Sequence, residues 1–214
     1  LVCAGLHADR LAALTGAPRE PRIVPFRGDY WVLRTPRRYL VRNLIYPVPD
    51  PAFPFLGVHF TRRITDGGVW LGPNAVLAFA REGYRRTDLI PRELAEVLAF
   101  RGFQRLAGRY WRTGLEEMVR DYSKRLFLEA LQRYVPELVM ADLLPGPSGV
   151  RAQALDAEGQ LVDDFVVNVQ EGQIIHVRNA PSPAATSSLA IARLIADQAD
   201  EAFALPTPAR PAGG

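Results

Sequence analysis

Apolar positions in the first third of the chain follow the short runs and the alternation that are typical of β-strands. Four segments rich in β-branched and aromatic side chains predict strands at residues 23–33, 40–46, 57–62 and 69–71. Turns rich in proline and aspartate separate them, and Asp66-Gly67-Gly68 is a hairpin signal. This part of the chain therefore predicts an antiparallel sheet.

The spacing of apolar residues changes to three or four between residues 84 and 134, which predicts helices that begin near residue 89 and at residue 115. The Pro-Gly-Pro-Ser-Gly sequence at residues 145–149 predicts a loop. Beyond it we expect a return to strands and then one amphipathic helix, with the strands at 149–155, 161–170 and 173–178 and the helix at about 184–203.

The two ends of the chain each carry a candidate turn. Residues 1–5 are interpreted as the end of a buried strand with Gly5 at the turn, followed by a short helix over residues 6–14. Near the other end, Asn179-Ala180-Pro181-Ser182-Pro183 separates a strand from a helix, with Ser182 as the N-cap and Pro183 at the first helical position. A helix start presents free N–H groups to an anion or to an electron-rich ring edge, although most such turns bind nothing.

Composition adds limits on the class of protein. The 214 residues are 48% hydrophobic and 23% charged, which is ordinary for a globular protein, and no apolar run reaches the length of a transmembrane segment. Cys3 is the only cysteine, which excludes an internal disulfide framework and a cysteine-based metal cluster. We therefore expect no metal site and a cytoplasmic location.

The basic residues are nearly all of one kind. The net charge is +3, and Lys124 is the only lysine beside the arginines. Arginine binds carboxylates through two parallel hydrogen bonds, so this bias suits a dianionic acid substrate, while a solvated arginine-rich surface explains most of these residues equally well. Because the arginines are dispersed, we expect no nucleic-acid partner.

Five blocks of sequence are distinctive when they are taken together. They are Ile45-Tyr46-Pro47-Val48-Pro49-Asp50, Phe55-Leu56-Gly57-Val58-His59-Phe60-Thr61-Arg62, Leu71-Gly72-Pro73-Asn74-Ala75, Gly149-Val150-Arg151-Ala152-Gln153 and residues 179–189. The chain resembles the L-2-hydroxyglutarate oxidase/dehydrogenase family of flavin-dependent, D-amino-acid-oxidase-like oxidoreductases in these blocks, which follow the family order from about residue 1 to residue 203.

The resemblance implies an α/β fold, in which an α+β substrate domain joins part of an FAD-binding Rossmann-like domain. The expected divisions are residues 1–18 as a remnant of the FAD-binding domain, 19–146 as the substrate or cap domain with an antiparallel sheet and helices, 147–204 as the C-terminal return into the FAD-binding domain, and 205–214 as a disordered tail. The G-x-G-x-x-G turn of the family does not occur, and the chain does not begin with Met. We therefore expect a truncated two-domain D-amino-acid-oxidase-like fold, the C-terminal portion of an enzyme that does not retain FAD alone.

The family also implies a cofactor and a reaction. FAD accepts a hydride from L-2-hydroxyglutarate, which becomes 2-oxoglutarate, and then passes the electrons to oxygen or to a membrane electron carrier. With such a carrier, the expected location extends to the inner face of the membrane as a peripheral protein. Two alternatives stay open: a free-standing, non-catalytic α+β binding or assembly module, and an oxidase of another 2-hydroxy or amino acid.

His59 is the candidate catalytic base. Alternation places it on the strand face opposite Val58 and Phe60, and an imidazole can accept a hydroxyl proton at neutral pH. A lone histidine in a strand is more often structural, and the resemblance makes the two interpretations equal. His7 and His176 have weaker claims.

The remaining candidates follow from the matched blocks. Arg151, Tyr46 and Asn74 are the expected substrate contacts, because Arg151 follows Gly149 at a strand start and the other two end strands. The expected cofactor contacts are Ala4, Gly5, Gly149, Arg151, Asn179, Ala180, Pro181, Ser182 and Pro183.

Overall fold

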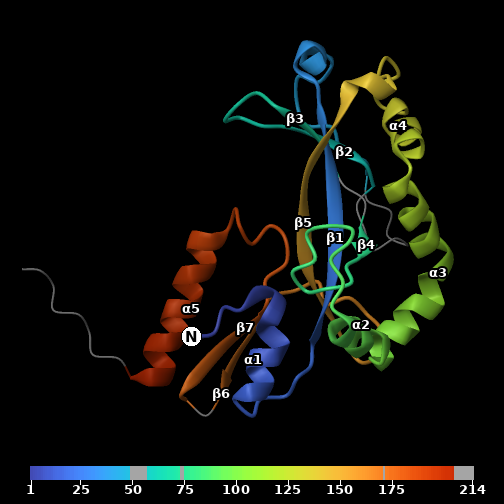
Figure 1. Ribbon diagram of the computed structural model, residues 1–214. Coiled ribbons are helices and arrows are strands. Elements are labelled where there is room, and N and C mark those ends of the chain that lie inside the picture. Colours follow the sequence, from blue (N-terminus) through green and yellow to red (C-terminus); the bar gives the residue numbers. More distant parts are fainter. Residues whose placement is uncertain (49–56, 73–74, 171, 205–214) are drawn as a thin grey trace, which may run out of the picture.

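The computed structural model describes residues 1–48, 57–72, 75–170 and 172–204. Figure 1 shows them as a larger and a smaller unit. The predicted disordered tail at residues 205–214 lies outside the described residues. The larger unit is a mixed sheet-and-helix layer, and the smaller unit contains both described ends of the chain.

An antiparallel sheet forms the larger unit, as the sequence predicts. Its strands are β1 (Arg22–Leu33), β2 (His59–Arg62), β3 (Val69–Gly72), β4 (Val76–Leu77) and β5 (Leu143–Leu155). The order is β2-β3-β1-β4. β5 forms a further antiparallel pair with β1, along almost the whole length of β1. Asp66, Gly67 and Gly68 form the predicted hairpin turn between β2 and β3, where Gly67 adopts a positive φ of 62°.

Two parts of the sheet differ from the prediction. Residues 40–46 do not form a strand, because the 3-10 helix η2 (Thr35–Leu40), with Pro36 in its first turn, takes up the start of the segment and only Ile45 pairs with Phe60. The predicted loop at residues 145–149 belongs instead to β5. β5 is an edge strand with a register shift opposite Asp29 and Trp31, and an edge or a bulge tolerates proline because no second ladder needs its N–H.

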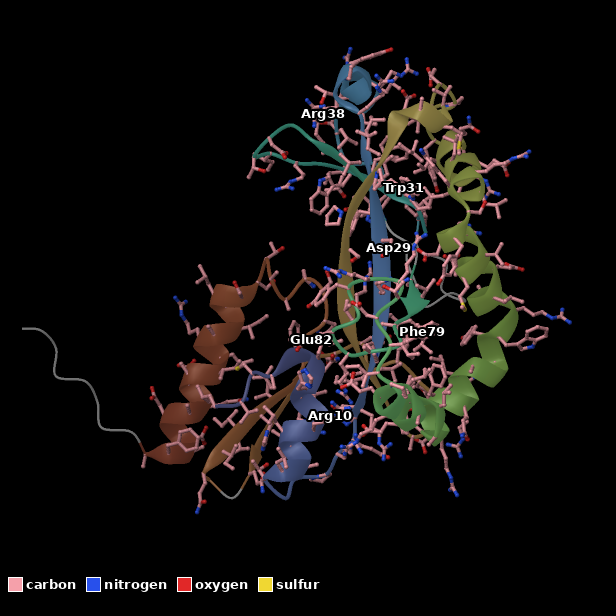
Figure 2. The ribbon with its side chains drawn as sticks, viewed as in Figure 1. Arg10, Asp29, Trp31, Arg38, Phe79 and Glu82 are labelled. Carbon is pink, nitrogen blue, oxygen red and sulfur yellow. The ribbon has the colours of Figure 1, made fainter. Side chains whose placement is uncertain are left out.

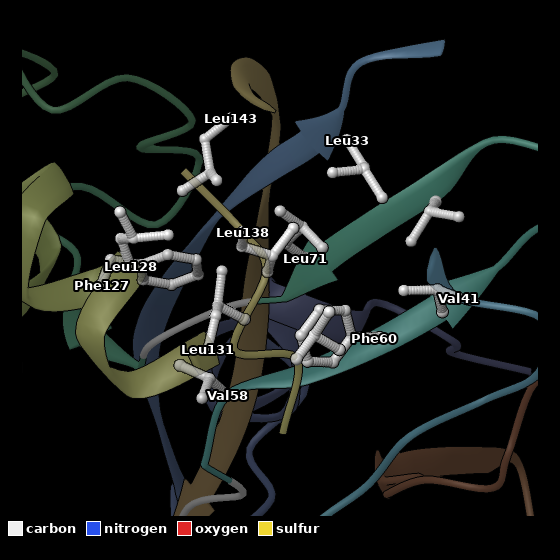
Figure 3. Packing of buried hydrophobic residues seen from close by; sticks show 12 residues of the cluster. Leu33, Val41, Val58, Phe60, Leu71, Phe127, Leu128, Leu131, Leu138 and Leu143 are labelled. Carbon is white, nitrogen blue, oxygen red and sulfur yellow. The ribbon is translucent and has the colours of Figure 1, made fainter. Parts of the chain in front are cut away.

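Three helices cover one side of this sheet: α2 (Pro91–Leu98), α3 (Arg101–Tyr122) and α4 (Lys124–Gln132) (Figure 1). The predicted single helix over residues 115–134 is divided at Ser123, whose hydroxyl accepts a hydrogen bond from the Leu126 N–H and so caps α4. Apolar residues of α4 meet the sheet in a continuous core that includes Phe60, Leu71, Phe127 and Leu131 (Figure 3).

We expect Leu131→Ala to lower the free energy of unfolding by about 2–5 kcal/mol, because Leu131 is 0% exposed at the centre of this core. Leu126→Ala is the matched control, since Leu126 on the same helix is 39% exposed and should cost less than about 1 kcal/mol. Urea denaturation of both variants measures the difference, and equal losses would contradict the described packing of α4.

The smaller unit is built around the pair β6 (Val166–Gln170) and β7 (Ile174–Asn179), with the helices α1 (Ala8–Leu14) and α5 (Ser188–Phe203) on either side (Figure 1). Val2 pairs in parallel with His176, so the first residues of the chain lie alongside β7. They form an isolated bridge and not the predicted end of a buried strand, since Leu1 is 65% exposed. Gly5 turns away from this contact with a φ of 49° into the 3-10 helix η1 (Gly5–His7) and then α1, as predicted.

The start of the last helix was predicted wrongly. Ser182 does not cap it, and Pro183 is not its first residue, because α5 begins at Ser188. Two turns come first, in which the Ala184 N–H donates to the Pro181 carbonyl and the Ser187 N–H donates to the Pro183 carbonyl. The Ser182–Pro183 peptide bond is cis. The N–H groups of this loop are therefore partly used within the loop itself.

Candidate active site

His59 begins β2 and lies opposite Gly72 of β3. Only 5% of its surface is exposed. Its Nδ1 lies 3.1 Å from the Gly57 carbonyl oxygen, and a carbonyl can only accept, so in the neutral ring Nδ1 carries the hydrogen. Nε2 then has a free lone pair, and in the described part of the chain it makes no hydrogen bond. This is the geometry of a general base.

The pKa of His59 lies below its ordinary value. Burial is the largest cause, because the low-polarity surroundings disfavour the charged ring. The Gly57 carbonyl acts in the opposite direction, and the positive charge of Arg151 lowers the pKa further. His59 is therefore neutral, and able to accept a proton, at neutral pH.

Tyr46 lies against His59 rather than apart from it. The two rings are stacked, with centroids 4.6 Å apart and planes 15° from parallel. The Tyr46 hydroxyl is hydrogen bonded to Oγ1 of Thr61 at 3.0 Å. The structure thus brings two predicted site residues together, although Tyr46 contacts the imidazole through its ring face. The third, Asn74, lies outside the described residues.

Three residues near His59 were not predicted individually as site residues: Tyr30, Thr61 and Gly72. A Cβ on Gly72 would lie 2.9 Å from Nε2 of His59 and 2.6 Å from Cε1 of Tyr30, so only glycine leaves room for both rings. The available signal was the position of Gly72, since a glycine inside a strand often marks a close approach.

Arg151 comes from β5, across the sheet from His59, where it pairs with Phe26 of β1. It is exposed and forms no hydrogen bond or ion pair within the described residues. Gly149 lies two residues earlier on the same strand face, opposite Gly28, and has open space where a side chain would be. An unpaired guanidinium beside an open glycine is a suitable place for a carboxylate and a flat ring.

A hollow of about 240 Å³ lies where the N-terminal segment meets β7 and β5. Of the predicted cofactor residues, Gly5, Asn179 and Ala180 line it, together with Cys3, Ile23, Ala152, Val177 and Arg178. Ala4 instead packs against the small core of Ala8, Ile23 and Ala154. Pro181, Ser182 and Pro183 follow Ala180 in the turns before α5 and do not line the hollow.

These residues fit one part of a flavin. The lining is mainly small or apolar, and Gly5 is exposed with nothing within 4 Å of the position of a Cβ, which leaves its backbone open to a flat ring. The volume is below that of most complete ligand pockets, so the hollow suits the edge of a ring and not a whole dinucleotide. The amide of Asn179 is already used, because it donates to the carbonyls of Val162 and Asp164.

The charged residues near the sheet have mostly structural partners. Asp29, at the middle of β1 in Figure 2, accepts hydrogen bonds from Arg27 at 3.1 Å and from Arg86 at 2.7 Å. Arg10, between α1 and α2 in the same figure, donates to Glu93 at 2.7 Å and Glu96 at 3.1 Å. The Arg10 pairs connect the two units, and within the described residues Arg151 is the cation without such a partner whose charge acts on His59.

Neither a metal cluster nor a spanning helix was found in the described residues. No group of three or more His, Cys, Asp or Glu side chains in the described part of the chain could hold a metal ion. Across the same residues, no helix combines the length and the apolar character needed to cross a membrane.

Comparison with known proteins adds related sequences. L-2-hydroxyglutarate dehydrogenase, mitochondrial, of Nematostella vectensis is 58% identical over 209 residues, which are 96% of this chain and 46% of the relative. The human protein of the same name is 51% identical over 96% of this chain and 45% of its own length. L-2-hydroxyglutarate dehydrogenase of the bacterium Indibacter alkaliphilus is 51% identical over 94% of this chain and 50% of its own length. The chain thus spans about half the length of these relatives.

A solved structure shares the fold. Dithionite-reduced L-α-glycerophosphate oxidase from Mycoplasma pneumoniae with FAD bound superimposes with a TM-score of 0.58 and 19% identity, over 98% of this chain and 43% of the other. This likeness confirms the predicted mixed α and β fold.

The predicted cytoplasmic location is wrong. The relatives from Nematostella vectensis and human are both named mitochondrial, which contradicts the prediction. The prediction rested on the single cysteine, and reduced cysteines are common to several compartments.

One family model, described as DAO, FAD dependent oxidoreductase, matches residues 1–198. The match confirms the resemblance that the sequence blocks indicated, and with it FAD as the cofactor and oxidoreduction as the class of chemistry. Because the match covers most of the 214 residues, the chain belongs to the family of FAD-dependent oxidoreductases.

Proposed function

We propose that this chain supplies the substrate-binding side of an enzyme that oxidises L-2-hydroxyglutarate to 2-oxoglutarate. Relatives with that activity in their names are 51–58% identical over almost the whole chain. The observation that carries the proposal is the placement of His59 within the field of Arg151, with Nδ1 bonded to the Gly57 carbonyl and with no hydrogen bond to Nε2 from the described residues.

In this proposal Nε2 of His59 accepts the proton of the C2 hydroxyl. The C2–H bond breaks with its electron pair, and the C2–O bond becomes the carbonyl of 2-oxoglutarate. FAD, when bound, supplies the hydride acceptor. Gly5, Ala180 and the open face beside Gly149 would hold one edge of its ring, because they combine little side chain with apolar surroundings.

Arg151 has two roles in the proposal. Its guanidinium forms charge-assisted hydrogen bonds to a substrate carboxylate and so orients C2 toward the cofactor. Its charge also stabilises the negative oxygen that develops as the hydroxyl proton leaves, and it helps to keep His59 neutral. The electrons would then pass to oxygen or to a membrane electron carrier.

The test uses a hybrid flavoenzyme, in which this chain replaces the matching half of the Indibacter alkaliphilus relative. Anaerobic mixing with L-2-hydroxyglutarate should bleach the oxidised flavin band and release one equivalent of 2-oxoglutarate. L-lactate is the control substrate, because it lacks the second carboxylate and should reduce the flavin much more slowly. A hybrid that binds FAD but is not reduced by L-2-hydroxyglutarate would contradict the proposal.

A further inference from the structure

The imidazole of His59 is held from several directions. Gly57 fixes its Nδ1 edge, and the absence of a side chain at Gly72 makes room for its Nε2 edge beside Tyr30. Tyr46 lies on a ring face, 4.6 Å away between centroids. Among these contacts, the stack with Tyr46 is the one that covers a face of the ring.

Tyr46 is itself anchored at two points. The Ile45 N–H donates to the Phe60 carbonyl at 3.0 Å and the Phe60 N–H donates back to Ile45 at 2.8 Å, which fixes the backbone beside β2. At the far end of the ring, the Tyr46 hydroxyl is bonded to Thr61 at 3.0 Å. Because His59 and Thr61 lie on the same face of β2, one ring can bond to Thr61 through its hydroxyl and stack on His59 through its face.

We infer that Tyr46 is a positioning residue for His59, and that its stacked ring, anchored through Thr61, fixes the orientation of the imidazole and shields one ring face from water. This role differs from the substrate contact that the sequence suggested, because the hydroxyl already has a partner and the ring face is turned to His59. Its value for catalysis rests on the proposed function of His59.

The arrangement has an energetic consequence. Tyr46 is 47% exposed, so its ring costs little to remove from the fold as a whole, yet it covers a residue that is only 5% exposed. Without the ring, water reaches the imidazole and the charged form becomes easier to make, which raises the pKa of His59 toward its ordinary value. Within the described residues, Arg151 is the charged group whose field acts on His59, and it opposes that rise equally in every variant.

The experiment is an NMR titration of the histidine side chains in the 214-residue chain, which has three histidines. His59→Asn identifies the His59 signals. In the unchanged chain we expect hydrogen on Nδ1 and a pKa below the ordinary value. Tyr46→Leu should raise that pKa by roughly 0.5 to 1 unit and populate both ring tautomers. Tyr46→Phe keeps the ring but loses the hydrogen bond to Thr61, so its His59 pKa should lie between those of the unchanged chain and of Tyr46→Leu.

Tyr39→Leu is the matched control, because Tyr39 is also exposed but contacts Arg37 and not His59. A Tyr46→Leu chain with an unchanged His59 pKa and tautomer would overturn the inference. A Tyr46→Leu chain that no longer folds would overturn it too, since Tyr46 would then be a structural residue.

The outcome separates this inference from the proposed function. In the hybrid flavoenzyme, Tyr46→Leu should move the acid limb of the pH profile for flavin reduction upward by the same amount as the His59 pKa. If the pKa moves in the NMR titration and the profile does not, Tyr46 positions His59 but His59 is not the base. If neither moves, the positioning role itself is wrong.

Discussion

Replacing His59 with asparagine in the hybrid flavoenzyme should slow flavin reduction by L-2-hydroxyglutarate by about 10²–10⁴-fold, or roughly 3–5 kcal/mol of barrier. The asparagine amide can still donate to the Gly57 carbonyl, which Nδ1 contacts at 3.1 Å, so the local hydrogen bond survives. What is lost is the basic Nε2. Anaerobic stopped-flow absorbance measures this step without interference from reoxidation.

His7→Asn is the matched control for this prediction. His7 lies at the end of η1, is hydrogen bonded to Glu82 at 3.1 Å and does not line the hollow beside Gly5. The His7→Asn change should leave the rate of flavin reduction within about two-fold of the original, as expected for a surface substitution. A flavin-loaded His59→Asn enzyme that is reduced within a few-fold of the unchanged rate across pH 6–9 would remove His59 from the mechanism.

The sequence could predict those parts of the fold that depend on local patterns. β1 and β7 have the apolar, β-branched residues of strands, and α2 begins at the proline where the pattern changes. Residues 145–149 show the limit of such patterns, because their prolines and glycines are compatible with β5 only at the edge of the sheet and beside a bulge. That position is a property of the tertiary structure.

The same distinction applies to the candidate site. Alternation within one strand was enough to place His59 opposite its apolar neighbours, and both of those, Val58 and Phe60, lie in the core. The stack with Tyr46 depends on a single pair of backbone hydrogen bonds between Ile45 and Phe60, for which the sequence has no signal. The effect of Arg151 on His59 requires strands that are almost a hundred residues apart in sequence to share one sheet.

Arg151 should affect binding and proton transfer separately. In the hybrid flavoenzyme, Arg151→Met removes a charge-assisted contact to a carboxylate, which is worth about 1.5–3 kcal/mol, so KM should rise by roughly 10- to 150-fold.

The direction of the pH effect of Arg151→Met follows from the pKa of His59. The charge of Arg151 lowers the pKa of His59, so its removal raises that pKa, and a larger fraction of His59 is protonated and inactive at low pH. The acid limb of kcat/KM should therefore move to higher pH.

Arg151→Lys separates the two effects, because lysine keeps the positive charge but cannot form two parallel hydrogen bonds to a carboxylate. We expect its KM to rise while its acid limb stays within about 0.2 pH unit of the original. Flavin content, measured by absorbance in all three proteins, distinguishes a loss of cofactor from a loss of substrate binding. An Arg151→Met enzyme with an unchanged KM and an unchanged acid limb would exclude Arg151 from both roles, and the carboxylate of the substrate would have to bind elsewhere on the sheet.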